Sequence, residues 1–282
     1  MRRIVLTTLL IGLLAVSRAD AQQRPLVTED PETIGSGLVL LEAGFDHLRQ
    51  VVFPVSGLTG NLLRLPTFGL SFGVSSIAEI QIDGGLYNRL TVTERDAGAP
   101  LAGMLDFTGD QTTAIEDLVI ATKIRLVSEA AGRPAVGLRF ATKLPNASNE
   151  SGLGLDTTDF YASLLLGKTV QSIRVVGNGG FAILGDATRG DRQNDVLTYG
   201  LSLARAVAQG LEVVGEVNGR LDVRDGEPPP GTDTRGAMRV GGRFTRGTVR
   251  VDGALILGMT SRDPSYGVTA GFTWVFRGFT IP

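Results

Sequence analysis

Segments that alternate apolar and polar residues with the two-residue period of a β-strand recur along most of this chain. In Leu211–Val223 the odd positions are Leu, Val or Gly, and the even positions include Glu212, Glu216 and Arg220. One face of such a strand is apolar enough for lipid, and the other is charged. In a membrane, backbone polar groups must find partners within the protein, so a sheet can span only as a closed barrel. The pattern predicts an all-β fold, an up-and-down antiparallel transmembrane β-barrel.

Twelve segments carry the pattern, at residues 37–48, 62–75, 78–93, 116–128, 135–145, 158–168, 172–185, 195–206, 210–224, 236–246, 248–259 and 265–277. The gaps between them alternate between long or polar ones, beginning with 49–61, and short ones. Long outer loops and tight periplasmic turns produce this rhythm in membrane barrels. A soluble sandwich or lipocalin-like barrel is the alternative, with the apolar face turned inward. The loop rhythm and the strand number favour the membrane barrel, because lipocalin-type barrels close with about eight strands.

The first residues fit a signal peptide. Met1-Arg2-Arg3 is basic, Ile4–Val16 is an apolar run of thirteen residues, and Ala19–Ala21 ends in an A-x-A pattern. The run is shorter than the roughly 20 residues that a spanning helix needs. We therefore predict a signal peptide at residues 1–21, a short periplasmic N-terminal segment at 22–36 and one outer-membrane barrel at 37–282.

Composition excludes several kinds of site. The chain has no cysteine and a single histidine, His47, which leaves no disulfide framework, thiolate chemistry or His-rich metal cluster. Removing residues 1–21 takes away three Arg and one Asp, which leaves 24 basic and 28 acidic residues, a balance of −4. A nucleic-acid-binding surface would show a basic excess. We expect no cofactor, no metal site and no nucleic-acid partner.

The charged faces of the strands would line the lumen. The residues predicted to line it and to set its selectivity are Glu42, Glu79, Asp83, Lys123, Arg125, Arg139, Lys143, Arg174, Glu212, Glu216, Arg220, Arg239, Arg243 and Arg250. The first three strands lean acidic, and the fourth, fifth, seventh and tenth lean basic, so facing walls would set up a transverse field. Rings of lining charge select solutes in such pores. Alternatively, opposite charges pair across the lumen and close it. Side chains can fill a barrel of about eight strands, whereas one of about sixteen leaves an aqueous channel, and twelve strands lie between these sizes.

Residues 141–159 form the most distinctive stretch. A strand ends in Lys143-Leu144-Pro145, a polar loop follows, and a strand restarts at Thr158. Here the chain resembles the outer-membrane transporter family named for the meta-pathway of phenol degradation. In that family a strand ending in Lys-x-Pro leads to a Gly-x-Gly-x-x-Asp loop, to which Gly152-Leu-Gly154-Leu-Asp156 is similar. The resemblance implies uptake of small compounds, aromatic ones among them.

Together these features predict a channel or transporter of the bacterial outer membrane, not an enzyme. Small solutes, aromatic or anionic compounds among them, would pass passively through a charged lumen. Its partners would be outer-membrane lipids, the solutes and the barrel assembly machinery, which would read an aromatic signal within Trp274–Phe279. Two alternatives remain open. One is an outer-membrane lipid hydrolase that uses His47, although no G-x-S-x-G motif or paired serine accompanies it. The other is a closed barrel that serves as a scaffold or surface-binding protein.

Overall fold

Fourteen strands follow one another in the computed structural model, which describes residues 24–280; the predicted signal peptide lies outside this range. The strands are β1 (Leu38–Phe53), β2 (Leu58–Gly73), β3 (Ala78–Gly85), β4 (Asn88–Arg95), β5 (Gln111–Ala114), β6 (Val119–Val127), β7 (Ala135–Lys143), β8 (Asp159–Val170), β9 (Ile173–Gly185), β10 (Gln193–Ala208), β11 (Leu211–Asp222), β12 (Arg235–Arg246), β13 (Val249–Gly258) and β14 (Tyr266–Arg277). Two 3₁₀ turns lie in the loops, η1 (Ala102–Met104) and η2 (Asn149–Ser151). Among the described residues, no helix is long and apolar enough to cross a membrane.

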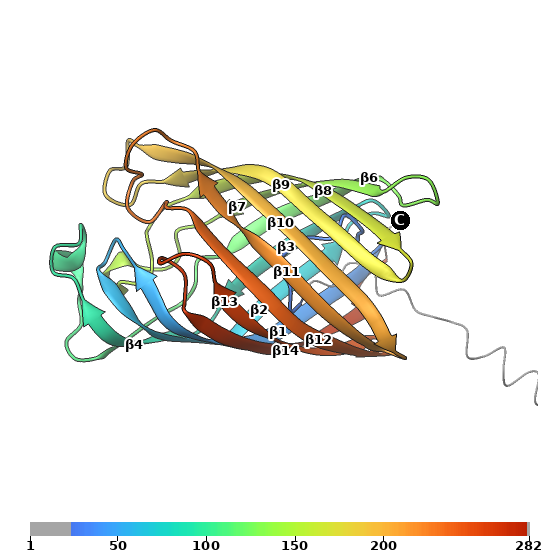
Figure 1. Cartoon of the computed structure of the whole chain (residues 1–282), viewed down its shortest axis with the longest axis horizontal. Coiled ribbons are helices and arrows are strands. Elements are labelled where there is room, and N and C mark those ends of the chain that lie inside the picture. Colours follow the sequence, from blue (N-terminus) through green and yellow to red (C-terminus); the bar gives the residue numbers. More distant parts are fainter. Residues whose placement is uncertain (1–23, 281–282) are drawn as a thin grey trace, which may run out of the picture.

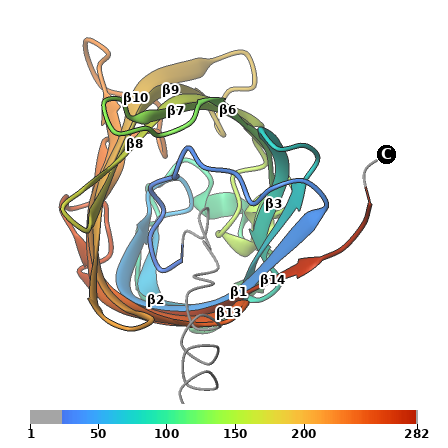
Figure 2. The same ribbon diagram turned by 90° about the vertical axis from the view of Figure 1, so that its right-hand side faces the viewer.

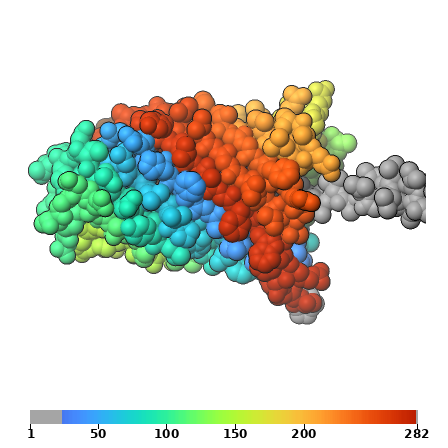
Figure 3. Space-filling view, turned by 90° about the horizontal axis from the view of Figure 1, so that it is seen from below, coloured from blue at the N-terminus to red at the C-terminus, as the bar shows by residue number. Residues whose placement is uncertain are grey.

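The strands close into a barrel because β1 pairs with both β2 and β14. Figure 3 shows β1 (blue) beside the red C-terminal strands on the outer wall. Both β3 and β4 pair with β2, so they form one interrupted wall strand, and β6 and β5, which pair with β3 and β4, form the next. The result is the predicted closed antiparallel barrel of 12 wall strands.

Burial alternates along each strand and separates the two faces of the wall. In β6, Ile120 and Leu126 are exposed on the outside, whereas Lys123 is fully buried inside. Large apolar side chains exposed on the outer wall include Phe140, Phe160, Leu164, Phe181, Leu201, Val240, Val251, Leu255, Phe272 and Trp274. An apolar outer belt around a polar interior is the arrangement of a membrane-spanning barrel. The soluble alternative, with the apolar face inward, does not describe this molecule.

The two ends of the barrel differ. The C-terminus and the tight turns lie at one end, and the longer loops lie at the other (Figure 1). At the first end, Gln171 and Ser172 join β8 to β9 and both have positive φ (46° and 67°), as a two-residue hairpin turn requires. The loop rhythm predicts that the first is the periplasmic end and the second the outer end.

The first connection is an exception to that rhythm. Residues 49–61 were predicted as a long gap, but β1 and β2 continue through it and only residues 54–57 form the turn. Beyond Leu48 the apolar residues change sides. Val51 and Leu58 are buried in a cluster inside the outer end of the barrel instead of facing lipid. The strands therefore continue beyond Leu48, but their apolar side chains point into the barrel there instead of outward.

Candidate functional site

The predicted lumen residues lie on the inner face of the wall. Four ion pairs join such residues across neighbouring strands: Arg239 with Glu216 (2.8 Å), Arg243 with Glu212 (2.7 Å), Lys143 with Asp159 (2.9 Å) and Lys123 with Glu79 (3.0 Å). Arg139 of β7 reaches Asp83 of β3 across β6 (3.5 Å). Arg220 donates to the main-chain oxygens of Gly231 and Asp233, and Arg250 donates to Thr245 Oγ1. These side chains lie on the wall face that strand alternation assigns to the lumen, and their part in selectivity stays a prediction.

Residues 24–36, which we call the plug, lie inside the barrel (Figure 2). The prediction of a periplasmic segment at 22–36 is wrong for this described part. The main-chain N–H groups of Val27 and Thr28 donate to the Glu216 carboxylate (2.9 and 2.8 Å), and that of Ile34 donates to Glu79 (2.7 Å). An irregular segment can remain in a barrel only where such groups satisfy its backbone.

Three acidic residues of the plug face the basic part of the wall. Their partners come from β6, β7 and β9: Glu29 pairs with Lys123 (3.3 Å) and Arg139 (3.0 Å), Asp30 with Arg174 (2.6 Å), and Glu32 with Arg125. Lys123 is fully buried, and a buried cation needs such partners. The plug carboxylates therefore neutralise part of the positive charge of these strands.

The other end of the plug reaches the opposite wall. The Arg24 guanidinium donates to Thr67 (3.3 Å) and Thr269 (3.0 Å), and its Nε lies 3.5 Å from Asp252. Its main-chain N–H points at Glu42 (3.4 Å), which comes from β1. Between the plug and the wall at β9 and β10 lies a small cavity of about 30 Å³. The plug therefore crosses the lumen.

Glycines in the wall make room for the plug. A Cβ at Gly167 would lie 2.9 Å from Cγ of Pro31, and one at Gly137 would lie 3.2 Å from its Cβ. Pro31 is itself fully buried. The wall is thus fitted to this segment in shape as well as in charge.

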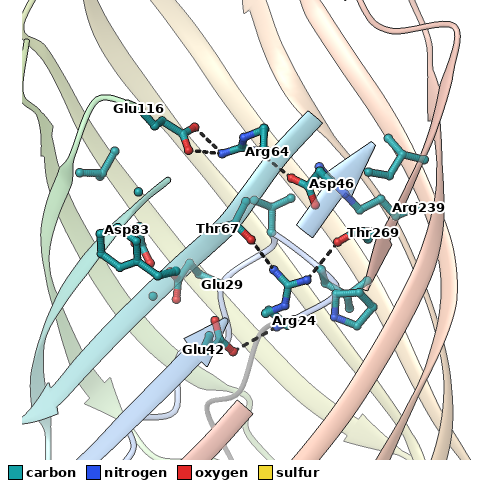
Figure 4. Close-up of a pocket in the computed structure, with 18 of the residues that line it drawn as sticks. Arg24, Glu29, Glu42, Asp46, Arg64, Thr67, Asp83, Glu116, Arg239 and Thr269 are labelled. Carbon is teal, nitrogen blue, oxygen red and sulfur yellow. Dashed lines mark hydrogen bonds and ion pairs between the residues drawn. The ribbon is translucent and has the colours of Figure 1, made fainter. Parts of the chain in front are cut away.

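A cavity of about 400 Å³ lies in the lumen beside the plug (Figure 4). Four arginines and six carboxylates line it, together with Phe68 and Tyr161: Arg24, Arg64, Arg139, Arg239, Glu29, Glu42, Asp46, Asp83, Glu116 and Asp117. Arg64 lies between Asp46 (2.7 Å) and Glu116 and pairs with both. The volume suits a small molecule. Sequence reasoning missed Arg64 and Glu116. A register shift between Gly44 and Asp46 brings Arg64 opposite Asp46, and Glu116 precedes β6, so simple alternation does not place either side chain inward.

Loops pack over the outer end of the barrel. We call residues 54–57, 96–110, 144–158 and 223–234 the loop cap. Ser56 Oγ donates to the Gly152 oxygen (2.7 Å), and the Asp106 N–H donates to the Glu150 oxygen (3.0 Å). Beneath them lies an apolar cluster: Leu48, Val51, Phe53, Leu58, Leu62, Leu90, Val92, Leu105, Phe107 and Leu153. Leu48 and Leu62 lie two positions beyond the cavity residues Asp46 and Arg64, so the cluster begins where the cavity ends.

The motif at residues 152–156 shapes this cap. Gly152 has a φ of +76°, and a Cβ there would lie 2.5 Å from Leu58 Cδ1. A Cβ at Gly154 would collide with the Ala147 oxygen. Asp156 also has a positive φ, 52°. The glycines are therefore required by close packing and turn geometry.

His47 lies on β1, where the hydrolase alternative would need a nucleophile beside it. Its cross-strand partners are Leu63 and Val268, so no nucleophile lies directly beside it. Ser71, the one serine of β2, is buried on the inner face of the wall. In the part of the chain that the structure describes, no group of three or more His, Asp or Glu side chains could hold a metal ion.

Comparison with known proteins finds similarity only among solved structures, since no family model and no curated protein matches the chain. The chain is similar to CdiB from Acinetobacter baumannii, with 6% identity and a TM-score of 0.40 over 86% of this chain and 60% of CdiB. It therefore spans less than two thirds of that protein. A mutant of the monoaromatic hydrocarbon channel TodX is 13% identical, with a TM-score of 0.43 over 88% of this chain and 93% of TodX. The toluene transporter TbuX from Ralstonia pickettii is 9% identical, with a TM-score of 0.39 over 88% and 92%. Identities this low do not transfer an activity.

Proposed function

We propose that this protein is a transporter of the bacterial outer membrane that passes small solutes through its lumen when the plug moves aside. The observation that carries the proposal is the cavity of about 400 Å³ inside a membrane-spanning barrel. The plug borders this cavity, and the loop cap packs over the outer end of the barrel. A segment held by ion pairs and hydrogen bonds can leave without breaking the sheet. The charged wall residues predicted from sequence would then line the open path and set its selectivity.

The lining of the cavity favours a polar or charged solute over a plain hydrocarbon. Ten charged side chains surround it, and Phe68 and Tyr161 contribute the only aromatic rings among the residues that line it. Charges lose hydration when an apolar solute replaces water beside them. A small compound with a charged group fits this lining, and one aromatic ring could contact Phe68 or Tyr161.

Single-channel recording in planar bilayers tests the proposal. The chain from residue 22 onward would be compared with the variant E29Q/D30N/E32Q, which removes the three plug carboxylates that pair with the wall. We expect rare openings in the wild type and at least ten times more frequent openings in the variant. Because the plug forms no part of the sheet, the barrel should still fold, and heat-modifiable gel mobility checks this. Asp191→Asn is the control, since Asp191 is exposed and its partner Arg189 lies 3.6 Å away.

Silence from both proteins, once each is verified as folded, would contradict the proposal. It would favour the second candidate, a closed scaffold. The plug that crosses the lumen, held to the wall by ion pairs and hydrogen bonds, is the observation that supports this candidate.

A further inference from the structure

We infer that the plug occupies an anion-binding surface of the lumen, and that its carboxylates stand where those of an anionic solute bind. The inference rests on the proposed function. The surface consists of Lys123, Arg125, Arg139 and Arg174, and its ligand would be a small solute with two or three carboxylates.

The geometry at Arg174 is that of specific carboxylate recognition. Its Nε and Nη2 donate to the two oxygens of Asp30, at 2.8 and 2.6 Å. Two parallel bonds of this kind match a carboxylate in shape as well as charge. Asp30 thus marks a position where a solute carboxylate would be held in the same way.

The remaining cations extend this position into a surface. Lys123 Nζ and Arg139 Nε both contact Glu29, at 3.3 and 3.0 Å, and Arg125 Nη1 contacts Glu32. Lys123, Arg125 and Arg139 come from the adjacent strands β6 and β7, and Arg174 comes from β9, one strand further along the wall. The plug presents its three carboxylates to this patch within four residues of chain.

Displacement of the plug removes the acceptors Glu29, Asp30 and Glu32 from these cations, which keep only part of their partners, such as Gln81 Oε1 for Arg139. Three wall carboxylates stay in contact with the patch: Glu79 with Lys123, Asp83 with Arg139, and Glu129 with Arg174. One positive charge is then in excess, and the donors that held Glu29, Asp30 and Glu32 point into the lumen. An unsatisfied charged donor is costly where water is restricted. An anionic solute with several carboxylates can satisfy these donors together, as the plug does.

Two measurements on the full mature chain test the inference, with citrate as the probe. In titration calorimetry of detergent-solubilised protein, E29Q/D30N/E32Q should bind citrate at least tenfold more tightly than the wild type. Adding R125Q and R174Q to that variant should weaken binding at least tenfold. In bilayers, citrate should raise the opening frequency of the wild type at least tenfold by competing with the plug. Acetate at equal ionic strength should not, because it carries one carboxylate.

The outcomes separate this inference from the proposed function. If the variant conducts but citrate neither binds it nor opens the wild type, the anion surface is refuted and the transporter remains. If citrate binds the variant but neither protein conducts, the surface remains and the transporter is refuted. Equal effects of acetate and citrate would overturn the requirement for several carboxylates. Heat-modifiable mobility confirms folding in every case.

Discussion

The substitution Lys123→Met should destabilise the barrel strongly, because Lys123 is at the centre of a buried charge network. Its side chain is fully buried and lies 3.0 Å from Glu79 and 3.3 Å from Glu29. Methionine has a similar length but no charge. Glu29 would keep Arg139, but Glu79 would keep only Gln81 Nε2 (2.9 Å) and the Ile34 N–H (2.7 Å). Removing one partner of a buried pair costs about 3–5 kcal/mol, and the two remaining donors place our expectation near the lower limit, about 3 kcal/mol.

Guanidinium unfolding of the refolded barrel gives the measurement. Trp274 is the single tryptophan of the chain and is 42% exposed on the outer wall, so its fluorescence reports its passage from lipid to water. The free energy of unfolding follows by linear extrapolation. Lys123→Met combined with Glu79→Gln should recover at least half of the loss, since the stranded charge is then absent. Arg189→Met is the control, and because Arg189 is 61% exposed it should change stability by less than about 0.5 kcal/mol.

Two results would refute this reasoning. One is a Lys123→Met variant whose unfolding free energy lies within about 1 kcal/mol of the wild type, well below the range for a broken buried pair. The other is a double variant that is no more stable than Lys123→Met alone. Either would mean that the charge of Glu79 is not what the lysine compensates.

Three further predictions concern the loop cap and a periplasmic turn. Gly152→Ala should loosen the cap at a cost of about 1–3 kcal/mol, seen as faster proteolysis of residues 144–158, whereas Gly190→Ala, with open space around it, should have no effect. Leu58→Ala should cost about 2–5 kcal/mol in guanidinium unfolding, because Leu58 is fully buried in the apolar cluster. Partial burial raises the pKa of Glu129, but the N–H of Thr169 and neighbouring cations outweigh it and lower that pKa below its ordinary 4.5. The stability from Glu129 is therefore present above pH 4.5 and lost as pH falls through the lowered value; Glu129→Gln should flatten this dependence by less than about 1 kcal/mol.

The wall of the barrel could be predicted from sequence because its rule is local. Side chains alternate across a strand, so Ile120 and Lys123 fall on opposite faces without any knowledge of their neighbours. The same rule places Arg239 inside and Val240 outside. It failed at Val51 and Leu58, where the strands continue but their apolar residues face an internal cluster. Periodicity identifies the apolar face of a strand, and only its surroundings decide whether that face points to lipid or to the interior.

The plug could not be predicted in this way, because its partners are distant in sequence. Glu29 and Lys123 are 94 residues apart, and Asp30 and Arg174 are 144 apart. The segment itself has no period and reads as a polar lead-in. The charges of the sequence carry one indication of the plug. The fourth, fifth and seventh predicted strands are basic, and three carboxylates lie within four residues before the first strand. A basic wall facing a closed lumen needs counter-charges, and Glu29, Asp30 and Glu32 were the nearest set outside the wall.

The difference between plug and loop cap indicates which of them opens first. The cap is held by an apolar cluster with Leu58 and Leu90 fully buried, and opening it exposes that surface to water at about 25 cal/mol per Å². The plug is held by ion pairs and hydrogen bonds, whose groups regain water or solute partners on release. Lys123 keeps Glu79 when Glu29 leaves, so release does not strand the most deeply buried cation of the wall. Displacement of the plug is therefore the less costly step, and a solute that satisfies the same cations reduces its cost further.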